Sequence, residues 1–161
     1  EQRIEHLQRI RDLQDQTEGF TAFITWNFQP DDTALGASAE RWDGIVSTGF
    51  DHLRTVAISR LFLDNIDSLQ ASWVTQGPKI AQVSLRYGIN DFGSTMLEEN
   101  VVSAAGTSHM NEMDLQTMER LIRDAGYTPQ RRNTRYESVM TPAQPDVLKG
   151  VSSTERSYSI S

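Results

Sequence analysis

Hydrophobic residues recur along this chain at two spacings, one typical of helices and one typical of strands. In residues 1–17 they fall at every third position, which predicts an amphipathic helix that ends at Gly19. In residues 20–29 they alternate with mostly polar residues, which predicts a strand with an apolar even-numbered side and a mixed odd-numbered side. We expect the even side to face outer helices and the odd side to face the lumen of a barrel.

Residues 68–106 alternate between the two patterns over a short distance. Residues 69–74 predict a strand, and a helix is predicted to start at Pro78, because the fixed φ of proline suits a first helical turn. Gly88 stands where a helix commonly ends in a left-handed residue. Residues 90–95 then predict the next strand, so this segment forms a βαβ unit.

The order of the predicted elements indicates the fold class. A helix predicted at residues 52–64 leads into the βαβ unit, so helices and strands alternate, which is typical of a parallel sheet. With 161 residues the chain is too short for a complete eight-stranded barrel, which needs about 250 residues. We therefore predict an α/β fold that forms a partial, roughly half, TIM-type (β/α) barrel with parallel strands and outer helices.

The carboxyl-terminal third contains one further strong helical pattern. It runs from Asn111, a plausible cap, to Ala125, and Gly126 stops it. A short extended segment is predicted at residues 128–136.

Two segments show neither the helical nor the strand spacing of hydrophobic residues. Residues 31–51 form a long connection that we interpret either as a lid over the mouth of the barrel or as a surface excursion. The end of the chain is dominated by Ser, Thr, Pro and charged residues, which rarely pack alone. We therefore divide the chain into a barrel part, residues 1–139, and a polar tail or arm, residues 140–161.

Charge and composition exclude several classes of function. The net charge of −7, from 15 basic and 22 acidic residues, argues against a nucleic-acid partner. No apolar run approaches the ~20 residues that span a bilayer, and no leader is visible, so we expect no membrane partner and a cytoplasmic parent protein. Because the chain opens with Glu1 inside a helical pattern, we expect a fragment of a longer protein.

Neutral polar residues on the inward faces, and polar residues beyond strand ends, are the candidate substrate contacts. Amides and hydroxyls can orient a nucleoside-like ribose, although structural polar pairs would look the same. Ligands of such sheets bind beyond the carboxyl ends of the strands. The candidates are Asn27, Gln29, Gln70, Ser72, Asp91, Thr95 and Asn100.

Candidates for acid or base chemistry are few and weak. Glu98 and Glu99 follow a predicted strand, and at most one of them faces a pocket; a solvated acidic turn is the alternative. His109 precedes the last helix, near the expected mouth. The catalytic residues are otherwise unknown from the sequence, and no metal-ligand, phosphate-loop or Ser-His-Asp pattern is present.

Several long runs of this sequence resemble one known enzyme family. The runs are TAFITWNFQP (residues 21–30), HLRTVAISRLFLDNI (52–66), QASWVTQGPKIAQ (70–82) and NDFGSTMLEENVVSAAG (90–106). In this order they resemble the carboxyl-terminal half of the cyclic dehypoxanthine futalosine synthases, which are radical S-adenosylmethionine (SAM) enzymes of menaquinone biosynthesis. The resemblance covers residues 1–136. The sequence departs from the family at Thr25, where the family has proline, and at residues 131–134, which read RRNT where the family has QRDT.

The resemblance implies a function for the whole protein and a division of labour within it. The family holds a [4Fe-4S] cluster with a CxxxCxxC motif in its amino-terminal half, and uses the cluster with SAM to make a deoxyadenosyl radical. That radical removes hydrogen from the ribose 4′ carbon of dehypoxanthine futalosine. The resulting substrate radical adds to the aromatic ring of the same molecule, and loss of an electron and a proton gives the cyclic product. This chain has no cysteine, so neither cofactor is expected to bind it alone. Its expected role is to supply lumen groups that hold the substrate, and it is expected to be inactive by itself.

Other readings remain open. The aminofutalosine synthases and the deazaflavin-forming (F0) synthases are related enzymes, although the run SWVTQGPK favours the first family. A different class is a non-catalytic partial barrel that serves in assembly. The expected partners are therefore a nucleoside-like small molecule, the missing amino-terminal barrel half, and a possible second copy that covers the open edge.

Overall fold

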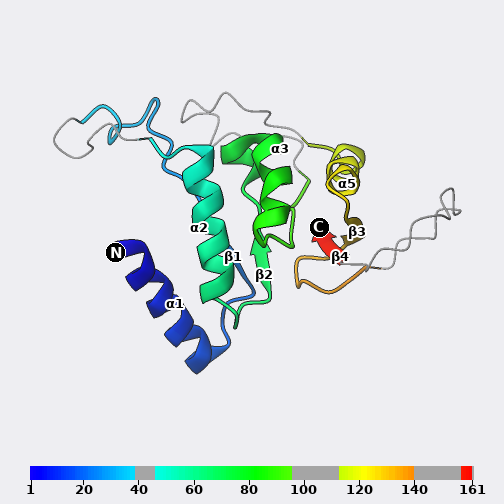
Figure 1. Ribbon diagram of the computed structural model, residues 1–161, viewed down its shortest axis with the longest axis horizontal. Helices are drawn as coiled ribbons and strands as arrows, with labels where there is room; N and C mark the ends of the chain where they lie inside the picture. Colours follow the sequence, from blue (N-terminus) through cyan, green and yellow to red (C-terminus); the bar gives the residue numbers. More distant parts are fainter. Residues whose placement is uncertain (39–45, 96–112, 140–156, 161) are drawn as a thin grey trace, which may run out of the picture.

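The computed structural model describes residues 1–38, 46–95, 113–139 and 157–160 (Figure 1). The elements in chain order are α1 (Gln2–Thr17), β1 (Ala22–Ile24), α2 (Gly49–Phe62), β2 (Ser68–Gln70), α3 (Trp73–Ser84), the 3-10 helix η1 (Leu85–Tyr87), α5 (Leu115–Asp124), β3 (Thr128–Arg131) and β4 (Ser157–Ile160). Of the helices in these described ranges, none combines the length and the apolar character required to cross a membrane.

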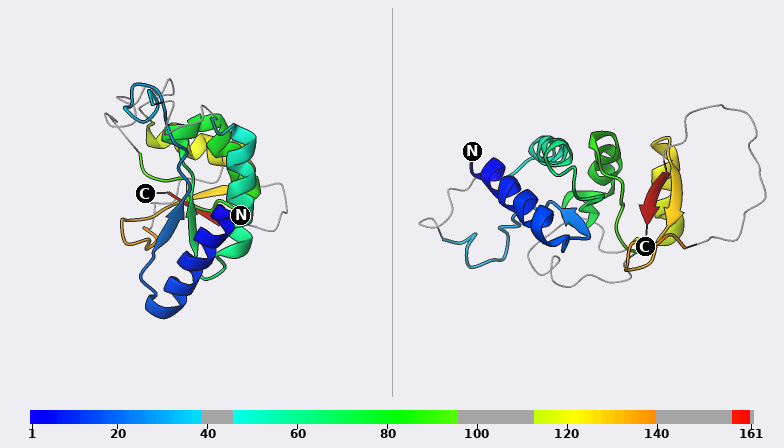
Figure 2. Two further views of the ribbon diagram at one scale, coloured as in Figure 1. Left: turned by 90° about the vertical axis from the view of Figure 1, so that its left-hand side faces the viewer. Right: turned by 90° about the horizontal axis from the view of Figure 1, so that it is seen from below.

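The named strands pair only in parallel. β1 pairs with β2, and β3 pairs with β4. A parallel bridge between Gln70 and Asp91 adds a third segment beside β2. Helices α2 and α3 lie on the same side of β1 and β2 (Figure 2). The predicted α/β class with parallel strands is confirmed for these elements, whereas the partial barrel stays a proposal.

The two faces of β1 are the reverse of the prediction. The register pairs Phe23 with Leu69, and residues paired in parallel strands point to the same side. Leu69 is buried in the main core, and Phe23 packs against that core. The odd-numbered side of β1 therefore faces the helices, and the even-numbered side faces away from them. Beyond the end of the strand, Trp26 and Phe28 are 68% and 43% exposed. The prediction failed because β1 carries a large apolar side chain on each face, Phe23 on one and Ile24 on the other, so hydrophobicity alone does not tell which face meets the helices.

The core lies between the strands and the helices α2, α3 and α5. Its largest cluster includes Val56, Leu69, Leu85, Phe92, Met118 and Ile122. A smaller cluster of Leu7, Leu63 and Ile66 holds α1 against the end of α2. These contacts fix the strand ends on which the candidate site is built.

Helix α1 departs from its prediction in its end and in its buried side. Glu18, not Gly19, takes the left-handed conformation at its end, with φ of 49°. Leu7 is buried, but Ile4 and Leu13 remain 43% and 46% exposed. The apolar stripe of α1 is therefore only partly covered by the described residues.

Side-chain caps move the starts of two helices from their predicted positions. α2 begins at Gly49, because Thr48 and Asp51 form a capping box ahead of the predicted start at residue 52. α5 begins after Asp114, whose side chain accepts a hydrogen bond from a first-turn N–H. The predicted cap Asn111 lies outside the described residues.

Helix α3 contains a break where the sequence predicts a helix start. Its first turn begins at Trp73, and Gly77 is non-helical with φ of 79° and ψ of 159°. The regular part therefore resumes at Pro78, the predicted start. The predicted stops at Gly88 and Gly126 are confirmed by their φ values of 106° and 87°.

The remaining predicted extended segments are shorter than expected. The strand predicted at residues 90–95 is reduced to the bridge at Asp91, because Gly93 takes a φ of 96° that turns the chain. The segment predicted at residues 128–136 contains β3 as its only regular strand. Within the predicted tail, β4 lies parallel to β3. The domain boundary at residue 139 stays a prediction.

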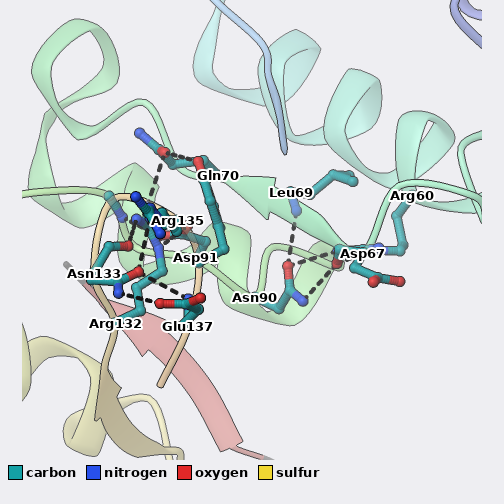
Figure 3. A network of polar contacts seen from close by, with 12 residues as sticks. Arg60, Asp67, Leu69, Gln70, Asn90, Asp91, Arg132, Asn133, Arg135 and Glu137 are labelled. Carbon is teal, nitrogen blue, oxygen red and sulfur yellow. Dashed lines mark hydrogen bonds and ion pairs between the residues drawn. The ribbon is translucent and has the colours of Figure 1, made fainter. Parts of the chain in front are cut away.

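Arg60 of α2 anchors the start of β2. Its Nε donates to the carbonyl of Gly88 at 2.7 Å, and its Nη2 donates to Oδ1 of Asn90 at 2.8 Å (Figure 3). The same Oδ1 accepts the N–H of Leu69 at 2.9 Å, and Nδ2 of Asn90 donates to the carbonyl of Asp67 at 2.9 Å. One arginine and one amide thus satisfy the backbone groups at this end of the strand.

We predict that Arg60→Met lowers the free energy of unfolding by about 2–3 kcal/mol, because it leaves partly buried carbonyls and Asn90 without their charged donor. Urea unfolding followed by circular dichroism measures the change. The matched control is Arg54→Met on the same helix, since Arg54 makes an exposed pair with Asp51 and should change stability little. Equal losses in the two variants would contradict the anchoring role of Arg60.

Candidate functional site

The candidate site lies on the side of the sheet that faces away from α2 and α3. Gln70 ends β2, and Asp91 pairs beside it through the parallel bridge. Arg132 follows β3 directly, and Tyr136 lies in the turn beyond it. The chain brings these four residues together from segments far apart in the sequence. Figure 3 shows Gln70, Asp91 and Arg132 among them.

Asp91 and Arg132 form a buried, two-contact ion pair. Oδ2 of Asp91 accepts hydrogen bonds from Nε of Arg132 at 2.7 Å and lies 2.6 Å from Nη2. The other carboxylate oxygen accepts the N–H of Gly93 at 2.8 Å. The side chains of Asp91 and Arg132 are only 1% and 6% exposed. Both nitrogens of Arg132 converge on one carboxylate oxygen, and the N–H of Gly93 holds the other oxygen of Asp91 in place.

Tyr136 and Gln70 complete the arrangement around Arg132. The guanidinium carbon of Arg132 lies 3.8 Å from the ring centroid of Tyr136, a cation–π contact. The hydroxyl of Tyr136 donates to Oε1 of Gln70 at 3.3 Å, and Nη2 of Arg132 lies 3.5 Å from the same oxygen. The amide oxygen of Gln70 therefore faces two donors of the protein.

The turn that carries Tyr136 is held by a single asparagine. Oδ1 of Asn133 accepts the N–H groups of Arg135 and Glu137 at 2.8 and 3.1 Å, and its Nδ2 donates to Glu137 at 2.7 Å. Tyr136 takes a positive φ of 63° in this turn. The ring is thus placed over Arg132 by local hydrogen bonds rather than by a strand.

Burial and neighbouring charge shift the pKa of Asp91 in opposite directions. Burial raises the pKa of Asp91 above its ordinary value, while the N–H of Gly93 and the guanidinium of Arg132 lower it in part. Burial also raises the pKa of Tyr136. Because Asp91 is held by Arg132 and Gly93, it orients other groups instead of acting as a free base.

Gly93 keeps space beside the amide nitrogen of Gln70. A Cβ at Gly93 would lie 3.1 Å from Nε2 of Gln70 and 3.6 Å from Nε1 of Trp73. Since Oε1 of Gln70 is fixed by Arg132 and Tyr136, Nε2 is the atom of this amide that can donate to a ligand oxygen. The arrangement can therefore orient an oxygen-bearing molecule by hydrogen bonding.

The other predicted contacts lie elsewhere. The hydroxyl of Ser72 pairs with that of Thr75, and both residues are buried at the start of α3. Thr95 is exposed. Nε2 of Gln29 donates to the carbonyl of Asn27 at 3.3 Å. The structure therefore brings Gln70 and Asp91 together but not Ser72, Thr95 or Gln29. Asn100, Glu98, Glu99 and His109 lie outside the described residues.

Asn27 faces α2 instead of the open side of the sheet. Its Oδ1 lies 3.2 Å from Nδ1 of His52, a residue that is 2% exposed. Burial lowers the pKa of His52 below its ordinary value. In the neutral tautomer that carries its proton on Nδ1, the ring of His52 donates to the amide oxygen of Asn27.

Arg132 and Tyr136 are the site residues that sequence reasoning missed. Both follow β3, in a segment predicted only as extended. A usable signal was present, because a carboxylate on an inward strand position, Asp91, requires a cationic partner when it is buried. The sequence does not tell which of its basic residues supplies that partner.

The residues present do not fit an iron–sulfur cluster. The chain has no cysteine. Across the residues that the structure describes, no group of three or more His, Asp or Glu side chains could hold a metal ion. No step through a cluster is therefore assigned to this chain.

We predict that Arg132→Met lowers the free energy of unfolding by about 3–5 kcal/mol at neutral pH, because it leaves the buried Asp91 carboxylate unpaired. The loss should shrink at acidic pH: without Arg132 the folded-state pKa of Asp91 rises further, and a raised carboxyl pKa favours the folded state only where the group is protonated. Adding Asp91→Asn should restore part of the stability. The control is the neighbouring Arg131→Met, whose side chain is 41% exposed and should cost much less. Denaturant unfolding at several pH values measures all four proteins.

We predict that His52 makes the fold less stable at mildly acidic pH. Its pKa is lowered in the folded state, so below about pH 6.5 the unfolded chain binds a proton that the folded chain excludes. The free energy of unfolding should fall between pH 7.5 and pH 5.5, and His52→Gln, which retains a donor for Asn27, should weaken that fall. An unchanged slope in the variant would contradict this role.

Comparison with known proteins assigns the chain to a family. Cyclic dehypoxanthine futalosine synthase of Halalkalibacterium halodurans is 54% identical over 88% of this chain and 36% of its own length. The enzyme of the same name from Streptomyces coelicolor is 46% identical over 89% of this chain and 34% of its own length. Aminodeoxyfutalosine synthase of Thermus thermophilus is 38% identical over 86% of this chain and 37% of its own length.

The chain thus spans little more than a third of these relatives. A family model described as the CofH/MqnC C-terminal region matches residues 17–145. Because this match covers most of the chain, the chain belongs to the family of the CofH/MqnC C-terminal region.

Proposed function

We propose that this chain is the substrate-binding, carboxyl-terminal part of a radical SAM enzyme that cyclises dehypoxanthine futalosine in menaquinone biosynthesis. The proposal rests on how the sequence identities to the named relatives rank. Two relatives named cyclic dehypoxanthine futalosine synthase are 54% and 46% identical, whereas relatives with other names in the same family, an aminodeoxyfutalosine synthase and a 4-hydroxyphenyl transferase, are 38% and 39% identical. The [4Fe-4S] cluster and SAM belong to the amino-terminal part of such a protein, beyond this chain.

The open side of the sheet supports this placement. Helices α2 and α3 lie on one side of β1 and β2, and the Gln70 amide lies on the other side with Arg132 and Tyr136. In a partial barrel this is the lumen side, which the amino-terminal strands complete. A fixed amide with a donor left for a ligand suits a substrate that carries a ribose.

In the proposed complex, each site residue has a limited role. Gln70 donates from Nε2 to a substrate hydroxyl, while Arg132 and Tyr136 hold its Oε1. Asp91 fixes Arg132 and does not exchange protons with substrate. Holding the reacting ring and ribose close together can remove a large share of a barrier without any acid or base from this part. Glu98, Glu99, Asn100 and His109 stay predicted contributors.

A chimera tests the proposal. Residues 1–139 should replace the corresponding region of the Halalkalibacterium halodurans enzyme, and the purified protein should be loaded with its cluster and given SAM and dehypoxanthine futalosine. We expect a product lighter than the substrate by two hydrogens, detected by mass spectrometry, because ring closure removes one hydrogen atom and then an electron and a proton. A chimera that binds its cluster but leaves the substrate unchanged would refute the proposal.

Two variants of the chimera separate binding from folding. Gln70→Leu should raise KM about tenfold, as expected for the loss of one hydrogen bond of about 1.4 kcal/mol, with the cluster still bound. Gln8→Leu, which changes an exposed glutamine of α1, is the control and should leave KM unchanged. If the chain is instead an assembly module, calorimetry of the chain alone will show no saturable nucleoside binding, and the chain will form a stable dimer.

A further inference from the structure

The segment after β3 folds into a short hairpin that touches the open side of the sheet. An antiparallel bridge pairs Arg132 with Ser138, so residues 134–136 form the tip of this hairpin. The hydroxyl of Tyr136 lies 3.3 Å from Oε1 of Gln70. The tip is therefore anchored at the end of β2, where the candidate site lies.

Arg135 occupies this tip with a fixed backbone. Its N–H donates to Oδ1 of Asn133 at 2.8 Å, and the N–H of Tyr136 donates to the carbonyl of Asn133 at 3.1 Å. Figure 3 shows Arg135 in the same network as Gln70 and Asp91. The side chain of Arg135 is exposed, so its guanidinium is accessible to a ligand.

The guanidinium of Arg135 is unusual in having no partner among the residues that the structure describes. Most other arginines there face a carboxylate, namely Arg9, Arg11, Arg54, Arg123, Arg131 and Arg132. The side chains of Arg3, Arg60 and Arg86 bind hydroxyl or carbonyl oxygens. Because the chain has 22 acidic and 15 basic residues, a shortage of carboxylates does not explain the unpaired arginine.

The carboxylates nearest to Arg135 are already engaged. Glu137, two positions along the chain, accepts Nδ2 of Asn133 at 2.7 Å. Both oxygens of Asp91 accept hydrogen bonds in its buried network. On the open side, the described residues therefore leave two donors, the guanidinium of Arg135 and Nε2 of the half-buried Gln70, and no carboxylate that is free to meet them.

We propose that Arg135 is a substrate-binding residue that receives a carboxylate of the molecule whose hydroxyl is held by Gln70. This inference rests on the proposed function, since it assigns a second part of the same substrate to the open side. A guanidinium presents two parallel N–H groups that match the two oxygens of a carboxylate. One arginine supplies one positive charge, which balances a carboxylate but leaves a phosphate dianion only half neutralised.

Replacing Arg135 in the chimera tests this role. Arg135→Gln should raise the KM for dehypoxanthine futalosine about tenfold or more, as expected for a lost charged hydrogen bond, and should change kcat little. Arg135→Lys, which keeps the charge, should recover part of the loss. The matched control is Arg120→Gln, which removes an exposed arginine of α5 that also has no partner among the described residues. Equal KM values for Arg135→Gln and Arg120→Gln would overturn the proposal.

An altered substrate tests whether Arg135 reads the carboxylate itself. The methyl ester of dehypoxanthine futalosine removes the negative charge at this group. In the unaltered chimera the ester should have a KM about tenfold above that of the acid, and in Arg135→Gln this difference should largely disappear, because the two changes remove the same contact. An ester penalty of the same size in both proteins would show that the carboxylate lies elsewhere.

Binding to the full chain can be followed without turnover. In an isotope-labelled chain, the Nε–H signal of Arg135, identified by its loss in Arg135→Gln, should shift saturably with millimolar benzoate and not with the neutral analogue benzamide. No saturable shift, or equal shifts with both probes, would overturn the proposal. A chimera that leaves its substrate unchanged, in combination with a benzoate response at Arg135, would refute the proposed function and retain the carboxylate site.

Discussion

The ion pair between Asp91 and Arg132 connects the two halves of the described structure. Asp91 bridges to the end of β2, and Arg132 follows β3, which pairs with β4. A buried ion pair is costly unless every lone pair and donor is satisfied. Here one carboxylate oxygen meets two guanidinium nitrogens, the other meets the N–H of Gly93, and the guanidinium stacks on Tyr136. Because few other geometries satisfy all these groups, the pair specifies how the segment after β3 docks against β2.

The same hydrogen-bonded network fixes the orientation of the Gln70 amide. The amide oxygen of Gln70 is engaged by Arg132 and Tyr136, so the orientation of its nitrogen follows from the ion pair. A change at Arg132 therefore reaches Gln70 through a direct contact and also through the loss of the packed ring. The pairing of Asp91 with Arg132 and the orientation of the Gln70 amide depend on one set of contacts, which is why the Asn133 turn that positions Tyr136 matters to both.

Sequence patterns predicted the elements better than their faces. Alternating helices and strands, the glycine stops at Gly88 and Gly126, and the parallel pairing are local consequences of periodicity and backbone freedom. The faces of β1 were reversed, since Phe23 on the mostly polar side packs against the core with Leu69. Gln70 and Asp91 were predicted because the alternating pattern places them on the inward faces of their strands. Arg132 was missed because the pairing of a carboxylate with one of many basic residues depends on tertiary contact.

The two sides of β1 differ more clearly in how their polar groups are paired than in their hydrophobicity. On the open side, Asp91 and Arg132 are both buried and paired, and the Gln70 oxygen is engaged, so that side is organised before any ligand arrives. On the helix side, Thr25, Asn27 and Ser59 present buried atoms without partners, although Asn27 is oriented by His52. Because the oxygen of the Gln70 amide is engaged, a ligand on this side can meet that amide only through its Nε2 donor.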